Sequence, residues 1–333
     1  MQMSVEYLGL ELKNPLVVSA SPMSHHTDRC RRLEEHGVSA IVMHSLFEEQ
    51  INAELHEIDH MLFHGKNAFA EALDFFPESR FENYETENYV NRLHALKTAL
   101  DVPVIASLNG VSNGGWVRYA KLLEAAGADA LELNLYYPAD RAWTVPAEIE
   151  LHYLEAIAAV KEHTSLPFAI KLAPAFTSLP HFLKSAEQAG ASAAVLFNRF
   201  YQSDIDLEAL EWTRKLYKSS PADFAAALRA VAVCYGQSGL EFCAGGGVGN
   251  GLDIIKAVMA GASTVACATV LYERGEAYVS VMLEEAARWM EENEYESFEQ
   301  MRGAISYAKA PNPSALERAN YVDLLSHGDD LWF

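Results

Sequence analysis

The chain has 333 residues, a length that suits one large α/β barrel better than a small module. Half of its residues are hydrophobic and 21% are charged, ordinary globular values that disfavour a disordered chain, a collagen-like fibre or a coiled coil. Lys and Arg number 25 against 46 Asp and Glu, a net charge of −21 that repels a phosphate backbone, so we expect no nucleic-acid partner.

Targeting signals and paired cysteines are missing from the sequence as well. No basic and then apolar leader opens it, and no apolar run approaches the roughly 20 residues that cross a bilayer. Cys30, Cys234, Cys243 and Cys267 lie far apart, without the CxxC pairs of a zinc site or a redox dithiol. We therefore expect a cytoplasmic protein with reduced thiols, no metal and no membrane contact.

Eight short apolar runs are the expected strands, and they follow residues 1–13, which alternate polar and apolar as a hairpin would. Some begin at a proline, and others follow a glycine that ends a helix. In chain order they are NPLVVSAS from residue 14, EEHGVSAIVMHS (34–45), VPVIASLN from 102, AAGADALELN (125–134), LPFAIKLAP from 166, QAGASAAVLFN (188–198), LEFCAGGG from 240 and MAGASTVACAT (259–269).

Eight strands alternating with helices predict a (β/α)8 TIM barrel, with a doubly wound open sheet as the alternative. We expect one domain over residues 1–333, with its core at about 5–290 and the last barrel helix at 273–289. Long loops are expected over the catalytic face at residues 46–85, after strand two, and at 199–223, after strand six. A C-terminal helical extension is expected at 294–333, where Pro313 and Ser314 could open a helix.

Functional side chains of a barrel sit where its strands end, so the strand list is also a list of candidate site residues. Polar groups at any one end could simply meet solvent, but together they are unusually frequent for positions that close apolar runs. The candidates are Ser19, Ala20, Ser21, His44, Ser107, Asn109, Asn134, Lys171, Asn198, Gly245, Gly246, Gly247, Ala268 and Thr269.

The segment AGGGVGNGLD, residues 244–253, places three glycines between strand seven and a helix. Glycines let backbone N–H groups approach a phosphate, and the helix dipole adds to the attraction. Ala268 and Thr269 follow strand eight, next to the place where barrels often bind phosphate. The segment therefore favours a phosphorylated ligand, with a tight turn and no ligand as the alternative.

Lys171 ends strand five inside IKLAP, where an apolar wall would bury its stem and aim its ammonium into the barrel. It could hold an anionic ring or phosphate, form a Schiff base, or pair with Glu132 at the barrel mouth. Asn134 and Asn198 add amide groups suited to the edge of a planar heterocycle, although each could instead cap a turn.

Seven segments, taken in order, resemble the dihydroorotate dehydrogenase family of FMN-binding barrels over about residues 5–290. They are LGLELKNPLVVSAS, ASLNG, LELNLYYP, FAIKLAP, LFNRFY, GGGVGNGLDIIKAVMAGAS and VACAT. The resemblance implies an FMN whose phosphate lies on Gly246, Gly247, Ala268 and Thr269, with Gly245 adjoining.

Other site residues follow from the same resemblance. Lys171 would lie near the flavin N1 and O2 edge, where a cation stabilises the reduced, anionic flavin. Ser107 and Asn134 match flavin-contacting positions, and Ser19, Ala20 and Ser21 match a backbone contact. Asn198 matches an asparagine that binds the substrate, and Asn109 and Asn134, at strand ends, are further candidates for substrate binding. The lack of an N-terminal membrane-binding extension resembles the soluble class of the family, whose members are dimers.

The sequence departs from the family at three places. Tyr137 stands where the family has the Cys or Ser that acts as base. A phenol, with an ordinary pKa of about 10, is a poor base at neutral pH but a workable acid. His44 and Ser45 replace a Lys-Ser pair, so a fixed cation is lost unless His44 is protonated. Residues 76–90, FPESRFENYETENYV, lack the family's substrate loop.

These observations leave three hypotheses of different classes. The first is an FMN-dependent oxidoreductase that passes a hydride between flavin N5 and a small cyclic or unsaturated substrate, with Tyr137, Lys171 and His44 as catalytic candidates. The substrate could be dihydroorotate, in pyrimidine biosynthesis. The second is a phosphate-binding lyase with Lys171 as a Schiff-base nucleophile. The third is a non-catalytic FMN-binding relative. A small-molecule substrate and a homodimer are the expected partners.

Overall fold

Eight parallel strands close into a barrel in the computed structural model, which describes residues 2–49, 84–110, 112–137, 141–199, 202–215, 217–309 and 312–326. The strands are β3 (Leu16–Val18), β4 (Ala40–Phe47), β5 (Val104–Asn109), β6 (Ala130–Leu135), β7 (Phe168–Leu172), β8 (Ala193–Leu196), β11 (Glu241–Gly245) and β12 (Thr264–Cys267). All eight predicted strands are confirmed. Pairing of Val265 in β12 with Leu16 in β3 closes the ring, which rules out the open sheet.

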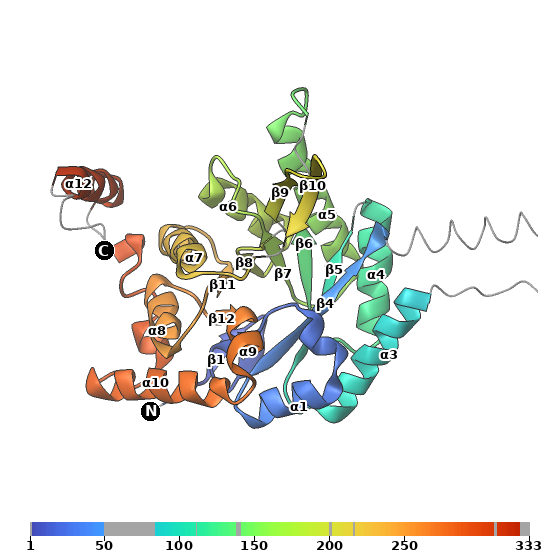
Figure 1. The fold of residues 1–333 in the computed structure, drawn as a ribbon, viewed down its shortest axis with the longest axis horizontal. Coiled ribbons are helices and arrows are strands. Elements are labelled where there is room, and N and C mark those ends of the chain that lie inside the picture. Colours follow the sequence, from blue (N-terminus) through green and yellow to red (C-terminus); the bar gives the residue numbers. More distant parts are fainter. Residues whose placement is uncertain are drawn as a thin grey trace, which may run out of the picture.

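Helices surround the barrel, and each lies beside the strand that it precedes or follows (Figure 1). The layer contains α1 (Thr27–Glu35), α3 (Tyr84–Ala99), α4 (Asn113–Ala125), α5 (Pro146–His163), α6 (Leu179–Ala189), α7 (Pro221–Cys234), α8 (Gly251–Ala260) and α10 (Tyr278–Glu292). Strands such as β5, β6 and β7 are buried at every position because helices cover their outer face.

Glycine ends the helices that lead into several strands, as predicted. Gly190 after α6 and Gly261 after α8 have φ of 114° and 125°, and each N–H closes the last turn of its helix. Gly37 and Gly127 have φ of 112° and 86° at the corresponding points before β4 and β6. This left-handed region is open to glycine, so these residues turn the chain directly from helix to strand.

The predicted N-terminal hairpin forms and covers the amino end of the barrel. Its strands are β1 (Val5–Tyr7) and β2 (Leu10–Leu12), which pair antiparallel. The Leu8 N–H in the turn donates a hydrogen bond of 2.6 Å to Oε2 of Glu241, the first residue of β11. Tyr7 is buried, so the hairpin closes the end of the barrel opposite to the candidate site.

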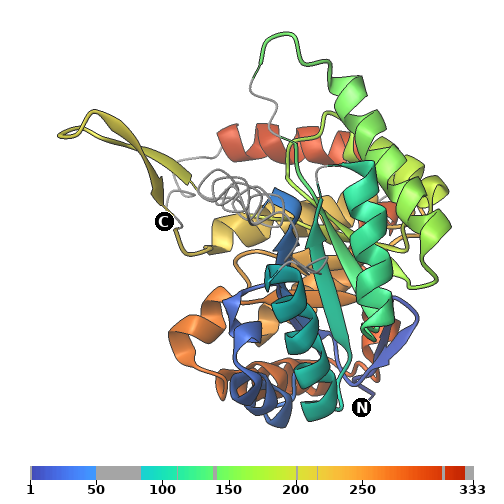
Figure 2. The same ribbon diagram turned by 90° about the vertical axis from the view of Figure 1, so that its right-hand side faces the viewer.

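The structure describes the two predicted long loops to different extents. Most of the first, residues 50–83, lies outside the described residues. The second contains an antiparallel hairpin that the sequence analysis did not predict, formed by β9 (Gln202–Asp206) and β10 (Glu211–Lys215). Figure 2 shows this hairpin projecting away from the helical layer.

The C-terminal part is helical, as predicted, but the last barrel helix begins later than expected. Residues 269–292 form two helices, α9 (Thr269–Arg274) and α10, because Gly275 interrupts them at a φ of 80°. Beyond them lie α11 (Phe298–Met301), the 3-10 turn η2 (Tyr307–Lys309) and α12, which begins at Pro313 as expected (Pro313–Ser326). Across the described ranges, every helix is too short or too polar to cross a bilayer.

Candidate functional site

Small and polar side chains fill the barrel interior and leave room at the carboxyl ends of the strands. Strand register places Glu132 and Asn134 of β6 opposite Ala169 and Lys171 of β7, so these four residues share the inner face. Continuing around the ring, the inner face carries Val195, Cys243, Gly245, Thr264 and Ala266. Such small residues leave space inside the barrel at the carboxyl ends of the strands.

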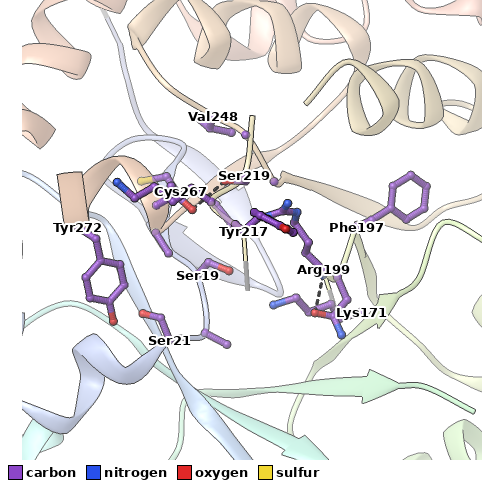
Figure 3. A pocket seen from close by; sticks show the side chains of 18 of the residues that line it. Ser19, Ser21, Lys171, Phe197, Arg199, Tyr217, Ser219, Val248, Cys267 and Tyr272 are labelled. Carbon is purple, nitrogen blue, oxygen red and sulfur yellow. Dashed lines mark hydrogen bonds between the residues drawn. The ribbon is translucent and has the colours of Figure 1, made fainter. Parts of the chain in front are cut away.

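A cavity of about 410 Å³ opens at this end, between the ends of β3, β7, β8, β11 and β12. Its size falls within the usual range for small-molecule sites, about 300–1,000 Å³. The predicted residues that line it are Ser19, Ala20, Ser21, Lys171, Asn198, Gly246, Gly247, Ala268 and Thr269. Figure 3 shows Lys171 and Arg199 on one side and Ser21 and Tyr272 on the other. The structure therefore brings together residues that lie up to 250 positions apart in the sequence.

Two glycines of the run, Gly246 and Gly247, have different surroundings. Gly246 and Gly247 both have positive φ, 87° and 80°. A Cβ added to Gly247 would lie 1.8 Å from the Ser220 carbonyl oxygen, whereas one added to Gly246 would meet nothing closer than 3.9 Å. Gly247 is thus needed to pack against the start of α7, while Gly246 leaves its backbone open beside the cavity. Gly245 is the last residue of β11 and does not line the cavity.

Side chains of the chain itself cap the start of α8, which follows the glycine run. Asn250 Oδ1 accepts a hydrogen bond from Asp253 N–H at 3.0 Å, and Glu285 Oε2 accepts one from Gly251 N–H at 2.8 Å. The chain's own side chains therefore satisfy N–H groups at the start of this helix. Thr269, where α9 begins, and Ser219 line the cavity, and the Ser219 hydroxyl donates to Thr269 Oγ1 at 2.8 Å.

Ser21 presents a buried hydroxyl without a protein partner in the described part of the chain. The residue is 8% exposed and lines the cavity. A buried hydroxyl costs free energy when it makes no hydrogen bond, about 1–3 kcal/mol. Ser21 is therefore suited to a ligand with a hydrogen-bonding group.

Lys171 forms the ion pair with Glu132 that the sequence analysis held as one alternative. Its Nζ lies 3.1 Å from Glu132 Oε1, and the two side chains are only 8% and 5% exposed. Lys171 lines the cavity and Glu132 does not. The pair therefore presents its positive end to the cavity and keeps its negative end within the barrel.

The three predicted asparagines do not all reach the cavity. Asn198 lines it, and its Nδ2 donates to Asn134 Oδ1 at 2.7 Å. Asn134 and Asn109 are buried and lie outside the lining. In the described contacts, Asn134 holds the side chain of Asn198.

Ser107 also lies outside the cavity lining, within the barrel wall. Its hydroxyl is 2.8 Å from Ser45 Oγ, and its N–H donates to the Tyr89 hydroxyl at 2.9 Å. Ser107 therefore joins β4, β5 and α3 in the described arrangement.

His44 is held as a neutral ring. Burial, with the nearby His25 and Arg92, lowers its pKa to about 3. The Ser24 hydroxyl donates to the Ser21 carbonyl oxygen and accepts from His44 N–H at 2.8 Å, and its oxygen lies 3.1 Å from His44 Nδ1. The interpretation of His44 as a protonated substitute for the family lysine is therefore not supported at neutral pH.

Tyr137 lies two residues beyond the end of β6, at the same end of the barrel, but its side chain is 47% exposed. Its ring faces His152 of α5, with 6.4 Å between ring centroids. Among the described residues, Tyr137 is not one that lines the cavity.

Several cavity residues were missed by the sequence analysis: Arg199, Tyr217, Lys218, Ser219 and Tyr272. Arg199 Nε lies 3.3 Å from Asp223 Oδ1, and Lys218 Nζ lies 2.9 Å from Glu273 Oε1. The signal that could have found the first four was the position of residues 199–223 after a strand, whereas Tyr272 belongs to α9, after β12. Both ends of that loop meet at the cavity, which confirms its predicted place over this face. Within the described ranges, His, Cys, Asp and Glu form no group suited to a metal ion.

Comparisons with known proteins agree with this architecture. A family model described as dihydroorotate dehydrogenase matches residues 68–290. The chain is similar to the dihydroorotate dehydrogenase B (NAD(+)) catalytic subunit of Thermoplasma volcanium, at 26% identity over 90% of this chain and 97% of that protein. The same-named subunit of Pyrococcus abyssi is 26% identical, covering 90% of this chain and 98% of that protein. That of Methanosarcina acetivorans is 27% identical over 80% and 84%.

Proposed function

This chain belongs to the dihydroorotate dehydrogenase family, and from that premise we propose that it is an FMN-dependent oxidoreductase acting on a CH–CH bond of a small cyclic or unsaturated substrate. The observation that carries the proposal is the cavity at the carboxyl ends of the strands. There, an open glycine backbone, hydroxyl groups and the positive end of a buried ion pair meet in one space.

The residues present fit FMN at both ends of the cavity. Gly246 offers backbone without a side chain, and Thr269 and Ser219 offer hydroxyls, a combination suited to a phosphate. Ser21 offers the buried hydroxyl that lacks a protein partner in the described chain. Lys171 offers an ammonium group on the side of the cavity opposite to Ser21 (Figure 3). These residues would hold the cofactor, with Asn198 next to Lys171 for the substrate.

FMN, when bound, supplies the centre that accepts or returns a hydride. The residues of the chain would position the cofactor and the substrate and balance negative charge in the cavity. Lys171 provides a fixed cation that favours negative charge in the cavity. Asn134 Oδ1 accepts from Asn198 Nδ2 at 2.7 Å and Asn198 Oδ1 accepts from Arg199 N–H at 2.8 Å, so the side chain of Asn198 is held in one orientation. Dihydroorotate is the substrate that we propose to test first.

Tyr137 is proposed as proton donor or acceptor from its place in the LELNLYYP motif. Its position just after β6 puts it at the mouth of the barrel, although its ring faces His152 in the described arrangement. Tyr137→Phe should lower turnover of any identified substrate while leaving FMN binding intact. Tyr136→Phe, at a neighbour that is 42% exposed, is the matched control. Turnover of Tyr137→Phe equal to that of the control would remove this role.

A non-catalytic FMN-binding protein is the second candidate, and one observation favours it. The described residues that line the cavity include no carboxylate or imidazole. The one thiol, Cys267, stays protonated at neutral pH and so accepts no proton, because burial raises its pKa to about 12. This candidate predicts bound flavin that no substrate reduces.

We also propose that the chain assembles as a homodimer through the β9–β10 hairpin. Ile205 pairs across the strands with Trp212, and these side chains are 52% and 75% exposed; Leu207 and Leu210 near the turn are more exposed still. A two-stranded hairpin with an uncovered apolar face is marginal in water, so a second copy packed on that face would stabilise it. Light scattering should give twice the chain mass, and Trp212→Glu should give the monomer. A monomeric wild type would refute this assembly.

The electron acceptor is proposed from the relatives, which are named as catalytic subunits of dihydroorotate dehydrogenase B (NAD(+)). We propose that NAD(+) is the final acceptor here, reached through a second protein. Reduction of NAD(+) by the isolated chain would refute the need for that protein.

The deciding experiment is an absorption spectrum of the purified protein, followed by anaerobic titration with dihydroorotate. Flavin bands that bleach support the dehydrogenase. Bands that persist, with this and related cyclic substrates, support the non-catalytic candidate. A protein that stays colourless after incubation with FMN would refute both. Borohydride trapping of Lys171 in the presence of substrate would then test the Schiff-base lyase.

A further inference from the structure

The ion pair between Glu132 and Lys171 is buried within the barrel. Three acidic groups feel the charge of Glu132: the Tyr7 and Tyr89 phenols and the Cys243 thiol. Burial raises the pKa of each of them, and the charge of Glu132 raises it further. All three are therefore neutral at neutral pH, so these three groups add no charge beside Glu132.

The orientation of the pair follows from register and burial. Glu132 lies one layer deeper than Lys171, since Lys171 pairs with Asn134 and Glu132 pairs with Ala169. Only the lysine lines the cavity. A ligand in the cavity therefore meets an ammonium group whose field is reduced by a carboxylate directly behind it, 3.1 Å away.

We propose that Glu132 is a positioning residue that lowers the reduction potential of the flavin by partly cancelling the charge of Lys171. This inference rests on the proposed FMN binding. Reduction adds two electrons and one proton to the oxidised flavin, so the ring gains one negative charge. A full cation beside it favours that charge, and a compensated cation favours it less. Glu132 thus sets how readily the bound flavin is reduced, without touching substrate or cofactor.

The direction in which the flavin reduction potential changes when Glu132 is replaced distinguishes this role from a purely structural one. If Glu132 only held Lys171 in place, its removal would let the ammonium move away and the potential would fall or stay constant. If its charge acts on the flavin through Lys171, removal of that charge raises the potential. Glu132→Gln keeps the side-chain shape and removes the charge, so it distinguishes the two.

The experiment measures the two-electron midpoint potential of the FMN-loaded protein by equilibrium with a reference dye. Xanthine, oxidised to urate by xanthine oxidase, supplies the electrons. Glu132→Gln should raise the ratio of reduced to oxidised flavin at least tenfold at a fixed potential, an upward shift of about 30 mV or more. Glu241→Gln is the matched control: Glu241 begins β11 at the far end of the barrel, where Leu8 N–H binds it, and its variant should keep the wild-type potential.

Each outcome bears on one claim. An unchanged or lower potential in Glu132→Gln, with FMN bound, overturns the inference. An equal rise in Glu241→Gln overturns it as well, because the effect would then not depend on the ion pair. If Glu132→Gln does not retain FMN, Glu132→Asp lengthens the pair instead, and a potential equal to the wild type in that variant overturns the inference. Failure of the wild type to bind FMN would refute the proposed function itself.

Discussion

The adjacent glycines Gly246 and Gly247 allow a quantitative test of why this turn requires glycine. Both have a φ near +80° to +90°, so an alanine at either position adopts the left-handed region at a cost of about 1–2 kcal/mol. Only Gly247→Ala also drives a methyl group against backbone, because its Cβ would lie 1.8 Å from Ser220 O and 2.9 Å from Phe224 N. Forcing that contact open adds about 1–3 kcal/mol.

The expected loss of unfolding free energy is therefore about 2–5 kcal/mol for Gly247→Ala and about 1–2 kcal/mol for Gly246→Ala. Urea unfolding of the cofactor-free protein, followed by circular dichroism, measures both without a contribution from ligand binding. Gly127→Ala is a second control, since Gly127 has a φ of 86° and nothing lies within 4 Å of the added Cβ. Equal unfolding midpoints for Gly246→Ala and Gly247→Ala would refute the contact between Gly247 and the start of α7.

Three further predictions follow from buried groups. The pKa of His44 is lowered from its ordinary value to about 3, so the unfolded chain binds the proton more tightly than the folded chain. The contribution of His44 to the free energy of unfolding should be full above about pH 6.5 and fall as the pH drops toward 3. His44→Asn should flatten this pH dependence when it is measured by urea unfolding. All four cysteines are buried, and burial raises each thiol pKa to about 11 or 12, so DTNB should label none in the native protein and four in guanidinium; rapid native labelling would contradict the burial. Lys171→Met should destabilise the fold by about 3–5 kcal/mol by leaving Glu132 unpaired, and the double variant with Glu132→Leu should recover much of that loss.

Local sequence determined the elements of the barrel. Each strand is a short apolar run that follows a proline or a helix-ending glycine, and these signals act over a few residues, so all eight strands could be located. The same logic located much of the candidate site, because a residue at a strand end needs only its own strand to reach the barrel mouth. Ser21, Lys171, Gly246 and Thr269 are examples.

Tertiary structure decided which of those strand-end residues face one another. Lys171 contacts Glu132 across 39 positions, and Asn198 contacts Asn134 across 64, and no local pattern distinguishes such pairs from free side chains. The inward place of Arg199 depends on Asp223 at the start of α7. Burial, which arises only when the barrel closes, makes His44 neutral. Composition and spacing thus determined the barrel and its active end, while charge compensation and side-chain direction depended on contacts that form only in the folded chain.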